Sequence, residues 1–260
     1  TPWEWHQELF QKANELGITI FSSPFDETAV DLLEKLGAPA YKIASFECNH
    51  IPLIKKVAST GKPMIISTGM ATISEIQLAV DTAIKEGCKQ IALLKCTSSY
   101  PAPPENTNLR TIPHMGSMFK CEVGLSDHTM GIGTSIAAIS FGACIIEKHF
   151  ILSRDDGGPD SHFSLEPAEL KKLVTESKRA WESIGNVSYG PTSEELESLV
   201  FKRSLYVSLD IKSGEALTKE NLSCIRPSHG LQPKYYELIL GRRVKKDLKR
   251  GKALSWEDIL

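Results

Sequence analysis

The sequence lacks the features that mark secreted, membrane-spanning and nucleic-acid-binding proteins. None of its six cysteines pairs in a Cys-x-x-Cys motif, and Cys96 and Cys144 lie in apolar runs where a thiol behaves as a small hydrophobe. There is no leading basic segment, and no apolar run approaches the roughly 18 residues of a bilayer span. The formal net charge is −2, and basic residues gather only over Arg242 to Lys246. We therefore expect a cytoplasmic protein that binds neither nucleic acids nor membranes.

The Gly-x-Gly-x-x-Gly fingerprint of dinucleotide-binding folds is also missing. Its nearest match, Gly131, Gly133 and Ile136, lacks the third glycine and follows a late strand-like run. What the chain has instead, over residues 18 to 150, is an alternation of apolar runs with helix-period segments, which predicts βα units and a parallel sheet. Six apolar runs are visible, namely ITIFSS, YKIAS, PMIIST, QIALLKCT, EVGLSDH and CIIEKHF.

Polar side chains close these runs one after another. They are Ser22 and Ser23, Ser45, Ser67 and Thr68, Thr97 and Ser98, Ser126 to His128, and Glu147 to His149. Barrel enzymes carry their active sites at the carboxyl ends of the strands, whereas a doubly wound sheet would show the glycine fingerprint. The sequence therefore predicts a (β/α)8 TIM barrel with six strands present, and we expect the first two strands to be missing from this chain.

Several signals predict where helices begin and end. Asp26 can cap a helix that stops at Gly37, and Thr72 to Glu75 forms a capping box. Pro167 lies near the start of a helical pattern over residues 166 to 184. This last helix is expected to close the barrel.

The sequence also predicts how the chain divides. We expect a barrel domain over residues 1–185 and a linker over 186–203, which contains NVSYGPTSEE. The segments DIKSGEALTKENL, from Asp210, and DLKRGKALSWEDI, from Asp247, resemble each other. This internal repeat predicts a small pseudo-symmetric β domain over residues 204–260.

Two histidines end consecutive predicted strands. Because neighbouring barrel strands end side by side, His128 and His149 should meet at the catalytic mouth, with Glu147 and Asp160 near them. Two imidazoles form half of a divalent-metal site, which water and substrate oxygens would complete. Each histidine alone could equally be a capping or satisfied core residue, so the metal hypothesis depends on the pair.

Lys42 lies in the middle of a short predicted strand. It shares a strand face with Ala40 and Ala44, while Tyr41 and Ile43 take the other face. Small neighbours suggest that Lys42 points into a crowded lumen, where a buried ammonium requires an anion. That anion is either the phosphate or carboxylate of a ligand or the partner in a structural ion pair.

Serines recur directly after four of the predicted strands. Ser23, Ser45, Ser67 and Ser126 could hold phosphate oxygens together with backbone amides, or could simply cap helices. Lys95 ends a strand as well. It could act as a Schiff-base lysine or belong to a surface ion pair.

Several stretches of the chain indicate a known family. They are YKIASFE, PMIISTGMATISEI, LLKCTSSYPAP, GLSDHTMG and EKHF with GGPD and FSLEP. Together they resemble the sialic acid synthase family, most of all its pseudaminic acid synthases. The tail NLSCIRPSHGLQP with LGRRVKKDLKRGKALSWEDI looks like that family's antifreeze-like (SAF) domain. The resemblance implies condensation of phosphoenolpyruvate with a 2-acetamido sugar aldehyde, which yields a nine-carbon 2-keto acid and phosphate. It also implies Mn²⁺ or Mg²⁺ on His128 and His149 as a Lewis acid.

The same resemblance implies roles for the other candidates. Glu147 joins His128 and His149 as a catalytic residue. The residues that would bind phosphoenolpyruvate are Lys42, Ser45, Ser67, Ser126 and, more weakly, Ser23. Tyr100 and Asp160 would bind the acceptor sugar, and Arg226 would reach the sugar's acetamido group in the partner of a domain-exchanged homodimer. The alternative for Arg226 is a turn residue before Pro227.

This chain departs from the family pattern in two places. Ser99 stands where the family keeps an asparagine. The family's first two strands, with a glutamate and a lysine that serve the reaction, have no counterpart in the sequence shown, so we expect residues to precede Thr1 in the complete protein.

Two further functions compete with the synthase hypothesis. One is a Schiff-base aldolase that uses Lys42 or Lys95, and the other is a non-catalytic homologue that binds sugar phosphates. In the loop after the last predicted strand, Arg154, Asp155 and Asp156 either select the sugar or pair with one another in solvent.

Overall fold

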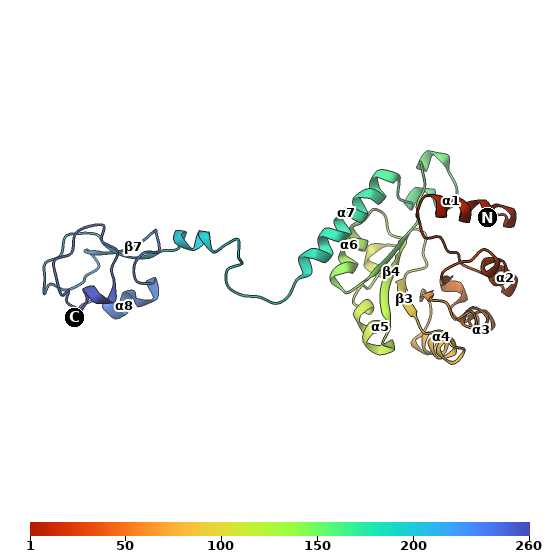
Figure 1. Ribbon diagram of the computed structural model, residues 1–260, viewed down its shortest axis with the longest axis horizontal. Helices are drawn as coiled ribbons and strands as arrows, with labels where there is room; N and C mark the ends of the chain where they lie inside the picture. Colours follow the sequence, from red (N-terminus) through yellow and green to blue (C-terminus); the bar gives the residue numbers. More distant parts are fainter. The chain divides into compact units, whose positions relative to one another are not determined.

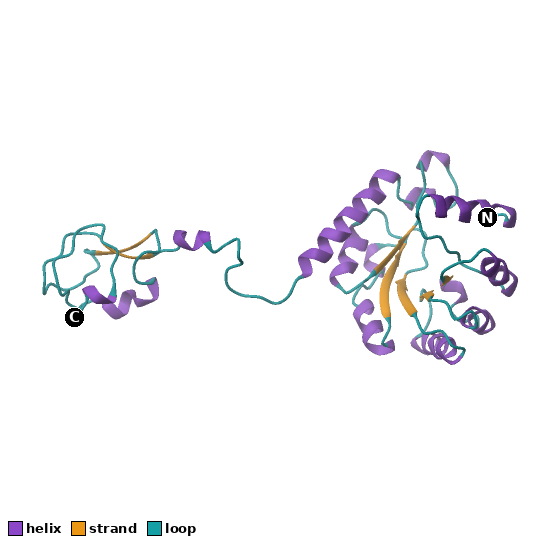
Figure 2. Ribbon diagram, in the orientation of Figure 1, coloured by secondary structure: helices purple, strands orange, loops and turns teal.

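The computed structural model describes residues 1–260 as two compact units, Thr1–Gly185 and Asn186–Leu260. In the first unit, helices wind around one sheet of five parallel strands (Figures 1 and 2). The strands are β1 (Tyr41–Ile43), β2 (Met64–Ser67), β3 (Ile91–Cys96), β4 (Glu122–Asp127) and β5 (Ile145–Lys148). The helices are α1 (His6–Glu15), α2 (Glu27–Lys35), α3 (Ile51–Ala58), α4 (Ile73–Lys85), α5 (Thr111–Phe119), α6 (Gly133–Ser140) and α7 (Pro167–Ile184). No helix of either unit combines the length and hydropathy that a membrane crossing requires.

The strand order follows the chain from β1 to β5 without a reversal. A doubly wound sheet would reverse direction at its first strand. Sequential order instead puts all crossover helices on one face of the sheet and curls it around the other, as in a barrel. The predicted parallel α/β architecture is therefore confirmed.

The prediction of six strands is wrong by one. Of the run ITIFSS, only Ser22 forms a bridge, parallel to Tyr41, and its carbonyl accepts a hydrogen bond from the Lys42 amide at 3.2 Å. Pro24 follows two residues later and has no N–H to donate, and Phe21 is exposed. The run therefore has neither the ladder bonds nor the burial that would extend it into a strand.

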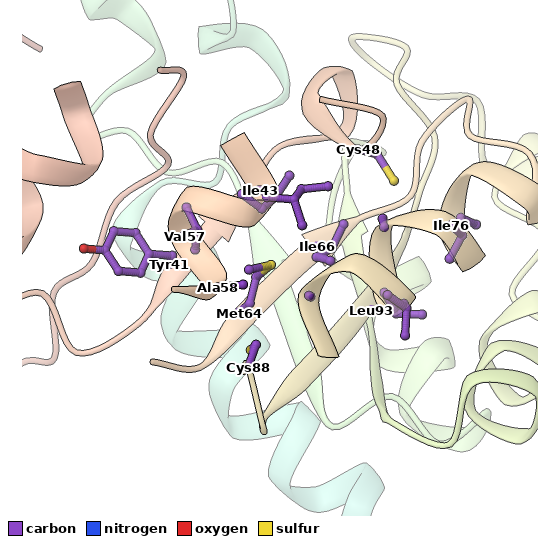
Figure 3. Close-up of a cluster of buried hydrophobic side chains, with 14 of the residues drawn as sticks. Tyr41, Ile43, Cys48, Val57, Ala58, Met64, Ile66, Ile76, Cys88 and Leu93 are labelled. Carbon is purple, nitrogen blue, oxygen red and sulfur yellow. The ribbon is translucent and has the colours of Figure 1, made fainter. Parts of the chain in front are cut away.

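Side chains alternate between the two faces of the sheet, as strand geometry requires. The buried side chains on the helix-covered face include Tyr41, Ile43, Met64, Ile66 and Leu93, and Figure 3 shows them packed with residues of the surrounding helices. Residues between them in sequence, such as Lys42, point to the uncovered face. The main hydrophobic core thus lies between sheet and helices and leaves the inner face free for polar side chains.

The predicted helix starts are confirmed. Asp26 Oδ1 accepts a hydrogen bond from the Ala29 amide at 2.8 Å, which caps α2. Thr72 and Glu75 form the predicted capping box at α4, and Pro167 is the first residue of α7. These local signals determine where the helices that pack against the curved sheet begin.

Gly124 of β4 allows a close contact with the neighbouring strands β3 and β5. A Cβ at this position would overlap the Ile145 carbonyl oxygen and lie 2.7 Å from Leu94 Cδ2. We therefore expect Gly124→Ala to lower the free energy of unfolding by about 1–3 kcal/mol. The matched control is Gly133→Ala at the start of α6, where no atom lies within 4 Å of the new Cβ. Urea unfolding of both variants is the measurement, and equal stability would contradict this packing.

The second unit is built from the two repeats. Ile211 and Leu248, at equivalent positions, exchange backbone hydrogen bonds of 2.9 and 2.8 Å. Its regular elements are the antiparallel strands β6 (Ser204–Val207) and β7 (Leu222–Ile225) and the helix α8 (Tyr236–Ile239). Two equivalent ion pairs flank the crossing, Asp210–Lys249 at 2.7 Å and Lys212–Asp247 at 2.8 Å. The repeat therefore produces the predicted pseudo-symmetric pairing.

Candidate functional site

One cavity on the inner face of the sheet is lined by every residue of the first unit to which the family resemblance gives a role. It has a volume of about 460 Å³. The candidates that line it are Ser23, Lys42, Ser45, Ser67, Tyr100, Ser126, His128, Glu147, His149 and Asp160. Arg226 is exposed in the second unit, just after β7. The structure thus brings these cavity-lining candidates together at the carboxyl ends of the strands. The role of each residue stays a prediction.

Lys42 and Glu147 form the charged centre of this cavity. Lys42 is only 6 % exposed, and its Nζ lies 3.6 Å from Glu147 Oε2 and donates to the Ile43 carbonyl at 3.1 Å. Burial lowers the pKa of Lys42, and the Glu147 carboxylate partly offsets that effect. Glu147 Oε1 accepts a 2.6 Å hydrogen bond from Ser126 Oγ. An ion pair therefore exists, as one alternative predicted, and it faces an open cavity.

None of the four candidate serines caps a helix. Ser45 Oγ accepts a hydrogen bond from the Gly69 amide at 3.2 Å. Ser67 Oγ is buried and has no hydrogen-bond partner, although Ser67 lines the cavity. A buried hydroxyl without a partner costs about 1–3 kcal/mol, so its presence in a polar cavity favours a ligand oxygen as its missing partner.

Gly69 explains why the cavity wall approaches so closely at this point. A Cβ on Gly69 would lie 2.8 Å from Ser45 Oγ and would overlap Ser98 Oγ. Only glycine therefore lets the backbone amide reach Ser45, a requirement that the sequence pattern did not reveal.

His128 and His149 lie side by side, with ring centroids 5.2 Å apart. His128 Nδ1 is 3.2 Å from the Thr97 carbonyl oxygen. Because a carbonyl can only accept, we assign the proton to Nδ1, which leaves Nε2 with a free lone pair. His149 Nδ1 lies 3.5 Å from Asp160 Oδ2. Contacts of this kind, made by the ring nitrogen that does not bind the metal, orient metal-binding imidazoles.

The donor set fits a divalent ion held by two protein ligands. Burial and the neighbouring His128 lower the pKa of His149, which keeps that imidazole neutral and able to bind a metal. No group of three or more His, Cys, Asp or Glu side chains is arranged to hold a metal. The remaining coordination positions would have to come from water and substrate, as the sequence predicted.

Sequence reasoning missed Phe163 and Cys96 as neighbours of the histidines. Phe163 packs against His149, with ring centroids 5.0 Å apart, and Tyr100 packs against His128 at 4.6 Å. Cys96 is buried as expected, but its Sγ lies 3.7 Å from His128 Nδ1. Burial raises the pKa of Cys96, and hydrogen bonds led by the one to His128 outweigh that effect and lower it to about 7. Cys96 is the register partner of Ser126 on β4, a placement that its apolar run in the sequence did not indicate.

The prediction that Cys144 is a buried small hydrophobe is wrong. Cys144 is exposed, and its thiol donates to the Val123 carbonyl at 3.2 Å. It lies just before β5, outside the core between sheet and helices, so an apolar run in sequence did not translate into burial.

A buried ion pair lies directly behind the two histidines. Asp127 and Lys148 are register partners on β4 and β5, and their side chains are 0 % and 2 % exposed, with Lys148 Nζ 3.0 Å from Asp127 Oδ2. Asp127 also accepts hydrogen bonds from the Thr129 amide at 2.8 Å and from Ser135 Oγ at 2.5 Å. Each partner therefore immediately precedes one histidine in the chain, and the pair ties both strand ends together.

We expect Lys148→Met to lower the free energy of unfolding by about 3–5 kcal/mol, because it leaves the Asp127 carboxylate buried without its cation. The matched control is Lys178→Met, which removes an exposed lysine that lies 3.8 Å from Glu182 and should change stability by less than about 0.5 kcal/mol. Chemical denaturation of both variants tests the difference. Equal stabilities would show that the buried pair does not hold the strand ends.

The loop after β5 corrects another expectation. Arg154 does not pair with its neighbours Asp155 and Asp156. Its Nη1 lies 2.5 Å from Glu169 Oε2, and its Nη2 lies 3.4 Å from Glu166 Oε2. Two adjacent carboxylates at the start of α7 attract the guanidinium more strongly than residues on its own short turn. The loop that carries Asp160 is therefore anchored to α7.

Comparison with known proteins places these features in a family. Residues 1–189 match the NeuB family, and residues 202–260 match the SAF domain. The chain is 45 % identical to pseudaminic acid synthase of Helicobacter pylori and covers 76 % of it, with all 260 residues aligned. It is 40 % identical to N,N'-diacetyllegionaminic acid synthase of Campylobacter jejuni, over 96 % of this chain and 75 % of that protein. The crystal structure of spore coat polysaccharide biosynthesis protein SpsE from Bacillus subtilis superposes with a TM-score of 0.68 at 36 % identity, over 100 % of this chain and 78 % of that one.

Proposed function

This chain belongs to the NeuB family, and on that basis we propose that it condenses phosphoenolpyruvate with an amino-sugar aldehyde to form a nonulosonic acid and phosphate. Relatives named pseudaminic acid synthase and N,N'-diacetyllegionaminic acid synthase align with 100 % and 96 % of the chain. The observation that best supports the proposal is the buried, unpartnered Ser67 hydroxyl, which lines the same cavity as the buried ammonium of Lys42 and the two histidines.

In the proposed reaction, Lys42, Ser45 and Ser67 bind the phosphate and carboxylate of phosphoenolpyruvate, with support from Ser126 and Ser23. The cation and the hydroxyls match a dianionic ligand, and Ser45 Oγ, which accepts from the Gly69 amide, can still donate its own proton. Binding would also compensate the buried ammonium more fully than Glu147 does at 3.6 Å. These residues therefore hold the enol with its C3 toward the histidines.

Carbon–carbon bond formation follows from that orientation. C3 of the enol attacks the aldehyde carbon, and the positive charge that develops at C2 is quenched by water. A divalent ion, Mn²⁺ or Mg²⁺, held by His128 and His149 would polarise the aldehyde oxygen when bound. Glu147, held by Ser126 at one carboxylate oxygen, accepts the proton of the water that adds at C2. The aldehyde oxygen takes up a proton from water and becomes a hydroxyl. The bond between C2 and the bridging phosphate oxygen then breaks, the C2 hydroxyl loses its proton to give the keto group, and inorganic phosphate leaves.

The acceptor sugar is proposed to lie against Tyr100 and Asp160. Both line the cavity, and Asp160 lies beside His149. We also propose that Arg226, which is exposed and makes no ion pair within 4.0 Å, serves the acetamido group of a sugar bound to a second copy in a domain-exchanged homodimer. A pseudaminic or related acid is the product that the 45 % identity favours.

The finer architecture and location belong to the same proposal. We propose a (β/α)8 barrel domain over residues 1–185, a linker over 186–203 and an SAF domain over 204–260. The sequential parallel order of β1 to β5 supports the barrel. A cytoplasmic location is supported by six free cysteines, which suit a reducing compartment.

The experiment that tests this function measures phosphate release by the full-length protein. Release should require phosphoenolpyruvate, a 2-acetamido sugar aldehyde and a divalent ion together. A Schiff-base aldolase would instead form a borohydride-trapped adduct on Lys42, since Lys95 does not line the cavity. Trapping of such an adduct, or turnover that survives chelation, would contradict the proposed chemistry.

A further inference from the structure

A second cavity lies on the helix-covered side of the sheet, between α5 and α6. It has a volume of about 900 Å³ and is lined by Lys95 of β3, by residues of the α5 and α6 turns, and by Phe141. We call it the α5–α6 groove. It shares no lining residue with the candidate active site. It is therefore a separate feature that the proposed synthase reaction does not use.

Lys95 gives this groove its charge. Lys95 is half-buried, and its Nζ donates to the Cys96 carbonyl at 2.7 Å and to Thr97 Oγ1 at 3.3 Å, but no carboxylate lies within 4.0 Å. Burial lowers the pKa of Lys95. Lys148, on the same face of the sheet, is compensated by Asp127. Lys95 has no such carboxylate, so an anion in the groove would supply the negative charge that its ammonium lacks.

The neighbouring side chains add to the same charge. Arg110 and His114 lie one helical turn apart at the start of α5 and line the groove, and neither forms an ion pair. No aspartate or glutamate lines the groove, whereas Leu109, Ala137 and Phe141 provide an apolar wall. The groove thus combines a lysine, an arginine and a histidine with a surface that suits an apolar group.

We propose that the α5–α6 groove binds a small phosphorylated molecule, with its phosphomonoester dianion on Lys95 and Arg110 and its apolar part against Phe141. A phosphomonoester is favoured because its dianion can accept from a lysine and an arginine together. Neither a metal ion nor a cationic ligand suits a groove that offers two cations and no carboxylate.

The groove is coupled to the active site through three consecutive residues. Lys95 donates to Thr97 Oγ1, and the Thr97 carbonyl accepts from His128 Nδ1 at 3.2 Å. An anion that draws the ammonium away from Thr97 changes the environment of the segment that orients His128. We therefore expect a ligand in the groove to alter turnover. This effect on turnover rests on the proposed function, but the binding of a ligand in the groove does not.

Phenyl phosphate is the probe, and calorimetric titration of the full-length protein is the measurement. Lys95→Met should weaken binding by about tenfold or more, because it removes the buried charge-assisted contact. Arg110→Gln, a surface change that leaves the fold intact, should weaken it as well. The exposed control Lys85→Met should bind as the unchanged protein does.

Two results would overturn the proposal. One is equal binding by Lys95→Met, Arg110→Gln and the Lys85→Met control. The other is loss of binding in Lys42→Met alone, which would assign the phosphate to the candidate active site. Binding that depends on Lys95 in a protein without synthase activity would uphold the groove and refute the proposed function, so the two failures can be told apart.

Discussion

His149→Ala should lower kcat/KM of the full-length protein by about 1000-fold, because it removes one of the two ligands that the proposed Lewis acid requires. The structure gives this residue no other substantial task. Burial lowers the pKa of its imidazole, its Nδ1 lies 3.5 Å from Asp160 Oδ2, and it lies beside His128 in the cavity. The variant should also lose most of its affinity for Mn²⁺, measured by electron paramagnetic resonance without substrate.

The matched control is His162→Ala. His162 lies in the same loop region and its ring contacts Phe163 at a centroid distance of 5.3 Å, but it is exposed and does not line the cavity. It should retain turnover within about threefold, since no proposed step uses it. If both variants lost activity equally, the effect of His149→Ala would reflect a disturbed loop, and the metal hypothesis would lose its support.

Lys42→Met has the second large effect. We expect KM for phosphoenolpyruvate to rise by about 100-fold, because loss of a buried ammonium that contacts an anion costs about 2–5 kcal/mol. KM for the sugar should change little, since the proposal assigns sugar binding to Tyr100 and Asp160 and not to Lys42. Steady-state kinetics with each substrate varied in turn separates the two.

Lys55→Met provides the control for Lys42. Lys55 is an exposed residue of α3 that lies 3.9 Å from Glu86, so its loss should leave both KM values unchanged. Because Lys42→Met also leaves Glu147 without its cation, thermal unfolding of the variant must be measured alongside. A folded Lys42→Met protein with an unchanged KM for phosphoenolpyruvate would contradict the assigned anion site.

The composition of the candidate site could be predicted because it depends on strand periodicity. The alternation of side chains along a strand was enough to place Lys42 on the face opposite Tyr41 and Ile43. The parallel order of the strands brought the carboxyl ends of successive strands to one edge of the sheet. His128 and His149 therefore met in space as their positions at two strand ends required. The helix caps at Asp26 and Thr72 depend on contacts between residues three apart in the sequence, so they could be predicted as well.

Features that depend on packing between distant segments could not be predicted. The Asp127–Lys148 pair depends on the register between two strands, and the pairing of Arg154 with Glu169 depends on where α7 docks. Lys95, like Lys42, was a candidate Schiff-base lysine, but it lies on the opposite face of the sheet from Lys42. The run ITIFSS is apolar enough for a strand and yet lacks the pairing that would make it one.

The most direct test of the account is the stoichiometry of product formation by the full-length protein. Phosphoenolpyruvate and a 2-acetamido or diacetamido-trideoxy hexose aldehyde are incubated with the protein and Mn²⁺, and the products are quantified by mass spectrometry and a phosphate assay. The account predicts one inorganic phosphate for each nine-carbon 2-keto acid, and no pyruvate. Release of phosphate with pyruvate and without a carbon–carbon bond, or no release at all, would contradict it.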